Sequence, residues 1–218
     1  EAVTNFDTSD ILLNNATISN FVGSGASYSL DVNPSPSGCV SVDINADVAN
    51  DSATNNNIAA TQLTREADLT LPTVTNITPS TPTISDSTTT FTLTVVYSEE
   101  MDISVNPVIT IGDTQNTITS PSGSWSDNKT YVATYSVTDG NEELADIDVK
   151  VENALDKAGN IQDAFTSNDL FSIDNKNPEI TLTSTAPETV NDGFTVTAQF
   201  TEAVTNFDTS DILLNNAT

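Results

Sequence analysis

Apolar and polar residues alternate along several short stretches of this chain. The clearest is FTLTVVY at positions 91–97, and a similar stretch, FTVTAQF, occupies positions 194–200. Side chains of a β-strand point alternately to opposite faces, so each stretch predicts a strand with one buried face. Each strand runs directly into Ser or Thr followed by Glu. The residues predicted to be buried are Phe91, Leu93, Val95 and Tyr97 in the first strand and Phe194, Val196, Ala198 and Phe200 in the second.

Two longer stretches share a second pattern. Residues 27–59 and 130–164 each contain an alternating strand led by an aromatic residue, a turn with Pro, Gly or Asn, a second alternating strand and an Asp-rich loop. The loop reads DSATNNN in one stretch and DKAGNIQ in the other. These signals predict an all-β chain in which two related domains of roughly 95 and 105 residues alternate, a size typical of β-sandwiches.

The chain also carries one identical repeat. EAVTNFDTSDILLNNAT occupies positions 1–17 and recurs at positions 202–218, so the repeat unit is 201 residues long. We therefore expect the C-terminal part of one domain in residues 1–70, a complete domain in residues 71–175, and the N-terminal part of the next copy of the first domain in residues 176–218.

Residues 1–70 lack a counterpart of the strand FTVTAQF, and half a core with an unpaired sheet edge is costly. A neighbour must supply the missing strands. Two arrangements remain open: the neighbouring repeats are covalently continuous in a tandem array, or separate subunits complete each other by strand complementation.

The charge balance excludes several classes of partner. The chain has 31 acidic and 5 basic residues, which gives a formal charge of −26. Such a surface repels nucleic acids and anionic membranes, and no apolar stretch approaches the ~20 residues of a membrane span. We therefore expect neither nucleic-acid binding nor membrane insertion. Cys39 is the one cysteine, so no disulfide forms within the chain, and its place at the start of CVSVDIN predicts an exposed thiol.

The residue types argue against an enzyme. The chain has no His and one Cys, so the usual pairs of nucleophile and base are missing. The doublets Glu99–Glu100 and Glu142–Glu143 do not form a glycosidase pair, because adjacent residues on a strand point to opposite faces.

Several segments resemble the bacterial immunoglobulin-like repeats of giant surface adhesins. They are FTVTAQFTEAVTNFDTSDILLNNAT with its continuation ISNF, GSGASYSLDV, DSATNNNIAATQL, FTLTVVYSEEM and ALDKAGNIQDA. The resemblance covers nearly the whole chain. It implies tandem Ig-like β-sandwiches, antiparallel and arranged end to end, an extracellular place at the cell surface, and a spacer role in a long protein.

Acidic residues gather where such domains would join. In an Ig-like order, the loops after the second and sixth strands return to the N-terminal end of the domain, where the linker enters. Clustered oxygen donors suit Ca²⁺, although Asp and Asn also cap turns without any metal. The predicted ligands are Asp68, Glu99, Glu100, Asp102, Asp156 and Asn160 at one junction, and Asp174, Asn175, Asn177 and Glu202 at the next, with Asp51 from the following copy.

Three functions remain as hypotheses. The leading one is a structural spacer of an extracellular fibre, made rigid by Ca²⁺ at the domain junctions. The second is a subunit that assembles into a filament or sheath through strand exchange. The third is a carbohydrate-binding module in which Trp125 stacks on a surface glycan, although a single Trp beside a strand is more often a lid on the core.

Overall fold

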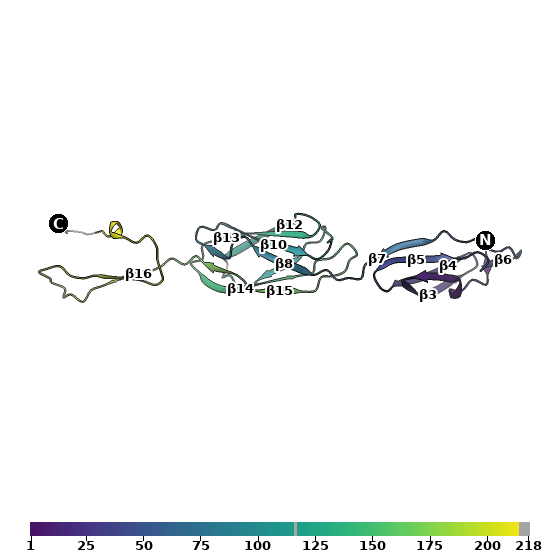
Figure 1. Cartoon of the computed structure of the whole chain (residues 1–218), viewed down its shortest axis with the longest axis horizontal. Helices are drawn as coiled ribbons and strands as arrows, with labels where there is room; N and C mark the ends of the chain where they lie inside the picture. Colours follow the sequence, from purple (N-terminus) through teal and green to yellow (C-terminus); the bar gives the residue numbers. More distant parts are fainter. Residues whose placement is uncertain (116, 214–218) are drawn as a thin grey trace.

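The computed structural model describes residues 1–115 and 117–213, and it is elongated (Figure 1). Three segments follow one another along the longest axis: the N-terminal segment (1–70), the central segment (71–175) and the C-terminal segment (176–213). The fold class is confirmed as all-β. The helical elements of the described part are two short 3₁₀ turns, and none of its helices is long and apolar enough to cross a membrane.

The central segment is a sandwich of two four-stranded sheets. One sheet has the order β12-β13-β10-β8 and the other the order β11-β14-β15-β9. Neighbouring strands are antiparallel, apart from β9, which pairs in parallel with β15. The strands are β8 (Val74–Pro79), β9 (Thr83–Ser85), β10 (Thr90–Tyr97), β11 (Val108–Ile111), β12 (Ile118–Trp125), β13 (Thr130–Val137), β14 (Glu143–Glu152) and β15 (Phe165–Asp174).

The alternating stretch at 91–97 forms β10 and supplies the centre of the sandwich core. Phe91, Leu93 and Val95 are completely buried and Tyr97 is 2% exposed, which confirms the period of two. The ring of Phe91 lies 4.6 Å from that of Phe171 on β15, so it joins the two sheets. Apolar residues of β8, β9, β13 and β14 complete the core.

Trp125 closes one edge of this core. Its indole Nε1 donates a hydrogen bond to the backbone oxygen of Val105 at 3.1 Å. Its ring centroid lies 5.5 Å from that of Tyr97 and 5.3 Å from that of Tyr131. The indole N–H is therefore engaged and the ring packs on two tyrosines, an arrangement that fits a lid on the core better than an open platform for a sugar.

The N-terminal segment contains smaller sheets and a thin core. Among its described residues only Ile11, Val40 and Ala49 are buried apolar residues. Cys39 is exposed, as predicted. Its strands are β1 (Val3–Thr4), β2 (Ile11–Asn14), β3 (Ala16–Ser24), β4 (Ser27–Pro34), β5 (Gly38–Ile44), β6 (Asn50–Asp51) and β7 (Leu63–Ala67), arranged in the sheets β1-β6, β2-β5-β7 and β3-β4.

The C-terminal segment is a hairpin of β16 (Ile180–Thr183) and β17 (Thr197–Phe200). The strand predicted from residue 194 begins at Thr197, because the ladder with β16 ends there and no other described strand pairs with the preceding residues. The side chains of Phe194 and Val196, predicted to be buried, are 57% and 50% exposed. The burial predicted for Phe194 and Val196 is therefore wrong, and Ala198 and Phe200 are only partly buried, because no second sheet in the described part of the chain covers this face.

The repeated sequence adopts the same local structure at both ends. Thr8–Asp10 (η1) and Thr209–Asp211 (η2) are 3₁₀ turns, each preceded by an Asp that accepts a hydrogen bond from the backbone two residues later. The accessible surface of the chain is 14037 Å². A compact monomer of 23.0 kDa would expose only about 9,600 Å², so the two outer segments leave much apolar surface uncovered.

Candidate metal centre

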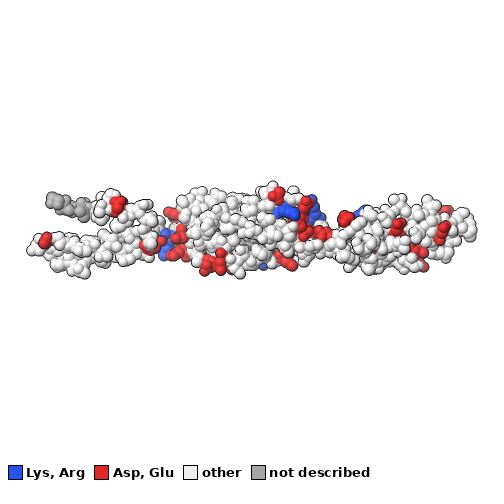
Figure 2. Space-filling view, viewed as in Figure 1, with Lys and Arg blue, Asp and Glu red and all other residues white. Residues whose placement is uncertain are grey.

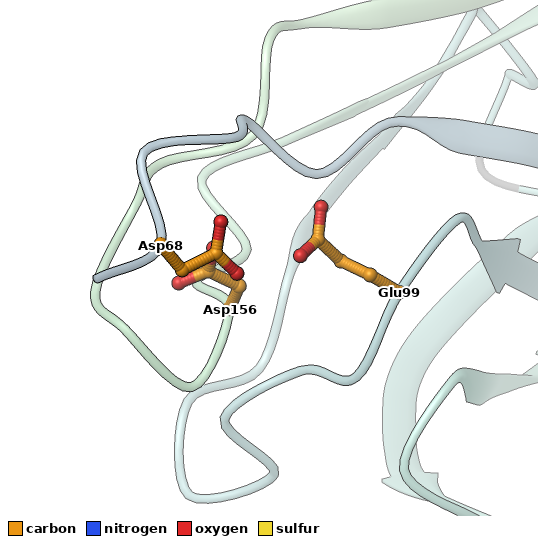
Figure 3. Close-up of side chains that lie close together, drawn as sticks. All are labelled: Asp68, Glu99 and Asp156. Carbon is orange, nitrogen blue, oxygen red and sulfur yellow. The ribbon is translucent and has the colours of Figure 1, made fainter. Parts of the chain in front are cut away.

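Three carboxylates meet where the N-terminal segment joins the central segment (Figure 3). Asp68 follows β7 in the linker, Glu99 follows β10, and Asp156 lies in the loop after β14. One oxygen of each lies within 4.8 Å of the others. Asp68 is exposed, Glu99 is partly buried and Asp156 is 1% exposed. These residues, called the acidic triad below, could hold a metal ion.

Asp156 is fixed by its own loop. Its Oδ1 accepts hydrogen bonds from the backbone N–H groups of Ala158 and Asn160, both at 2.8 Å. Its Oδ2 accepts one from the side-chain Nδ2 of Asn160, also at 2.8 Å. Gly159 turns the loop with a φ of +92°. These three hydrogen bonds fix the orientation of the Asp156 carboxylate.

The corresponding loop of the N-terminal segment has the same hydrogen bonds. Asp51 Oδ1 accepts from the backbone N–H groups of Ala53 and Asn55 at 2.8 Å, and its Oδ2 accepts from Asn55 Nδ2 at 2.9 Å. Thr54 stands in the place of Gly159 and takes a φ of 68°. The missing glycine of DSATNNN therefore does not prevent the loop from forming, although a left-handed threonine is strained.

We expect Gly159→Ala to destabilise the central segment by about 1–2 kcal/mol, because an L side chain is strained at this φ. An added Cβ would meet no atom within 4 Å, so the cost is conformational and not steric. Urea unfolding followed by Trp125 fluorescence measures it. The exposed Gly193, which also has no neighbour within 4 Å and no positive φ, is the matched control, and an equal loss in Gly193→Ala would contradict the prediction.

The triad concentrates negative charge. Partial burial and then the charges of Asp68 and Asp156 raise the pKa of Glu99, and the ammonium group of Lys129 opposes them with a smaller effect. Lys129 also donates from Nζ to the backbone oxygen of Ser98 at 3.2 Å. A divalent cation among the three carboxylates would remove the repulsion that raises this pKa.

The spacing of the triad oxygens is compatible with a bound metal ion. Two oxygens on opposite sides of a divalent cation are about 4.0–5.2 Å apart, since each lies about 2.0–2.6 Å from an ion such as Mg²⁺ or Ca²⁺. The three triad oxygens fall within 4.8 Å of one another. Carboxylate oxygens are hard donors that suit these ions, and the exposed side of Asp68 leaves room for water to complete the coordination.

Asn160 lies at the same junction with its nitrogen toward the linker. Its Nδ2 donates to the backbone oxygen of Asp68 at 3.0 Å as well as to Asp156. It was predicted as a ligand, but it holds the linker against the loop. The structure thus shows a positioning role for the amide nitrogen of Asn160, and ligation of a metal by its amide oxygen stays a prediction.

Glu100 and Asp102, also predicted as ligands, are engaged elsewhere. Glu100 forms an ion pair with Lys157 on the surface. Asp102 Oδ1 accepts from the backbone N–H of Ser104 at 2.9 Å and from its hydroxyl at 2.6 Å. Their oxygens are used by an ammonium group and a turn, so neither belongs to the triad.

The residues predicted for the second junction are not brought together. Asn175 is 2% exposed, and its Oδ1 accepts from the backbone N–H of Glu142 at 2.7 Å, so it anchors a loop. Asn177 donates from its backbone N–H to Asn141 Oδ1 at 3.2 Å. In residues 1–115 and 117–213 the acidic triad is the one such cluster. Asp174 and Glu202 are exposed at this junction, and Asp51 lies in the N-terminal segment beyond the central one (Figure 1).

Two basic residues beside the triad were not predicted. Lys129 and Lys157 are two of only five basic residues in the chain, and both lie near this junction (Figure 2). The sequence offered one signal for them, which is that basic residues are scarce in this chain. A rare positive charge beside an acidic cluster offsets the local repulsion between carboxylates.

Comparison of the chain with models of protein families, with curated proteins and with solved structures finds no match.

Proposed function

We propose that the chain is a structural spacer repeat of a long extracellular surface fibre, and that Ca²⁺ bound by the acidic triad makes the junction between the N-terminal and central segments rigid. One observation carries the proposal. Asp68 belongs to the linker, whereas Glu99 and Asp156 belong to two loops of the central segment. An ion that binds all three ties the preceding segment to the sandwich that follows it.

A spacer needs stiffness at its junctions, and repulsion alone supplies little of it. The chain carries a formal charge of −26. At physiological ionic strength charges are screened beyond ~8 Å, so this charge cannot straighten a fibre. A bridging ion acts on the linker directly. The end-to-end arrangement in Figure 1, with acidic side chains at the junctions in Figure 2, supports the same function.

The proposal predicts that chelation shortens the particle and lowers its melting temperature. Small-angle scattering would compare protein in millimolar CaCl₂ with protein in excess chelator, and with MgCl₂ as the control for ion type. At a Ca²⁺ concentration 100 times the Kd, binding stabilises the folded state by about 2.7 kcal/mol. Equal maximum dimensions and equal melting temperatures with and without Ca²⁺ would overturn the calcium part of the proposal.

A further inference from the structure

The two outer segments present open apolar surfaces at opposite ends of the chain. The N-terminal segment has a groove of about 420 Å³ between β4, β5 and β7. The C-terminal segment has an apolar hollow of about 630 Å³ between the hairpin and the residues that follow it. The apolar lining includes Val32, Val40, Val42, Leu63 and Leu69 in the groove, and Ile180, Leu182, Val196, Ala198, Phe207 and Ile212 in the hollow.

The central segment contains the strands that the groove lacks. There β13 pairs with β12 on one side and with β10 on the other, and β10 pairs with β8. In the N-terminal segment β4 pairs with β3, and its other edge is unpaired among the described residues. An unpaired strand edge beside an exposed apolar face can bind an additional strand through backbone hydrogen bonds and apolar contacts.

The correspondence between β3-β4 and β12-β13 rests on a shared irregularity. The ladder shifts between Ser19 and Val22 in one pair and between Thr119 and Ser122 in the other. Asn20 and Ser120, which lie at these shifts, both have left-handed backbones, with φ of 52° and 53°. The alignment places Ser29, opposite Val22, where the central segment has Thr134, opposite Ser122.

The hairpin β16-β17 corresponds to β8-β10. FTVTAQFTEAV at 194–204 aligns with FTLTVVYSEEM at 91–101, which puts Thr195 in the place of Thr92. In the central segment Thr92 lies opposite Thr134.

We propose that the groove of the N-terminal segment binds the β16-β17 hairpin of a second copy of this chain. The incoming hairpin adds to the free edge of β4, antiparallel, with Thr195 opposite Ser29. Its face formed by Leu182, Val196 and Ala198 covers the groove. Residues 1–17 of the receiving copy keep their own place, since β1 pairs with β6 and β2 with β5 in the same chain.

The β16-β17 hairpin of the same copy cannot fill the groove. To reach its own groove, the hairpin would have to pass the central sandwich, whose ten-residue β14 alone is about 33 Å long. Residues 175–179, which connect β15 to β16, span at most ~18 Å. Because the two surfaces lie at opposite ends of an elongated chain, repeating this head-to-tail contact from copy to copy builds a linear chain. Asp68 and Ala158 line the end of the groove at the junction, but the proposed strand pairing does not require an ion at the acidic triad.

Mixing two single-cysteine chains tests the register. In a Cys39→Ser background, one chain carries Ser29→Cys and the other Thr195→Cys. Directly opposed strand residues lie within disulfide reach, so we expect a disulfide-linked dimer in the mixture and little in either chain alone. A chain with Ser19→Cys on β3, which is one strand further away and opposite Asp31 instead of Ser29, and so at about 12 Å, replaces the first as the control. Equal dimer yields from both mixtures would overturn the register.

A matched pair of substitutions tests the surface. Leu182→Asp puts a charge on the apolar face of β16, and Thr181→Asp puts the same charge on its other face. Leu182 is 65% exposed in the single chain, so its replacement does not disturb the folded copy. Sedimentation velocity, in chelator and in Ca²⁺, is expected to show growth with concentration for the original chain and for Thr181→Asp, and a monomer for Leu182→Asp. A monomer for all three at the highest concentration, or assembly by Leu182→Asp, would overturn the proposal.

Discussion

Replacing Phe91 with alanine is expected to lower the free energy of unfolding of the central segment by about 3–5 kcal/mol, the range for truncating a buried aromatic residue. Phe91 is completely buried, and its ring contacts Phe171 at 4.6 Å and Tyr135 at 6.4 Å between ring centroids. The first contact crosses from one sheet to the other. The cavity would therefore open between the sheets, where neither can move in to fill it.

Urea unfolding followed by fluorescence measures this loss. Trp125 is the one tryptophan of the chain and packs on Tyr97 and Tyr131, so the signal reports on the central segment. Phe165→Ala on β15 is the control, because that ring is 36% exposed and its removal leaves no closed cavity. A loss no larger for Phe91→Ala than for Phe165→Ala would contradict a core shared by the two sheets.

The strands that carry this core were predictable because their pattern is local. Alternation at 91–97 requires only that one face be buried, and the central segment buries it. The similar pattern at 194–200 predicts the same buried face, but Phe194 is 57% exposed because the described part of this segment has no second sheet to cover it. A periodic pattern thus predicts which face will be buried, and the partner decides whether it is.

The parallel pairing of β9 with β15 was not predictable from the pattern. Ile84 is completely buried, but the three-residue strand around it is too short to show a period. Its place follows from the crossing of the chain from one sheet to the other after Pro79, and that crossing depends on contacts between residues far apart in sequence.

The candidate site was predictable at the level of segments and less so at the level of atoms. Topology alone predicted that the linker and two loops would meet, and Asp68, Glu99 and Asp156 do meet. Glu100 and Asp102 belong to the same segment, but an ion pair with Lys157 and a turn at Ser104 engage them. Which local partner each carboxylate contacts depends on the direction of its side chain, and the spacing of acidic residues in the sequence does not encode that direction.

Replacing Glu99 with glutamine is expected to change stability in opposite directions with and without Ca²⁺. Without the ion, partial burial and then the charges of Asp68 and Asp156 raise the pKa of Glu99 above its ordinary value of 4.5. The folded state therefore holds this proton more tightly than the unfolded state, and stability falls as the pH rises through the raised pKa. Glutamine removes that loss, so the metal-free variant should melt higher than the original chain at neutral pH.

With Ca²⁺ present the order should reverse. Loss of one of three carboxylates weakens the binding of Ca²⁺. The variant therefore loses most of the roughly 2.7 kcal/mol by which Ca²⁺ at 100 times the Kd stabilises the folded state. Glu100→Gln is the matched control, since it removes a neighbouring carboxylate that pairs with Lys157 on the surface, a contact that contributes at most about 1 kcal/mol. Calorimetric melting of all three proteins at neutral and acidic pH, in chelator and in CaCl₂, measures both signs. Two results would mean that Glu99 acts in folding and not as a ligand. One is a melting temperature in chelator that is lower for Glu99→Gln than for the original chain, and the other is an equal rise in melting temperature on adding Ca²⁺ to the two proteins.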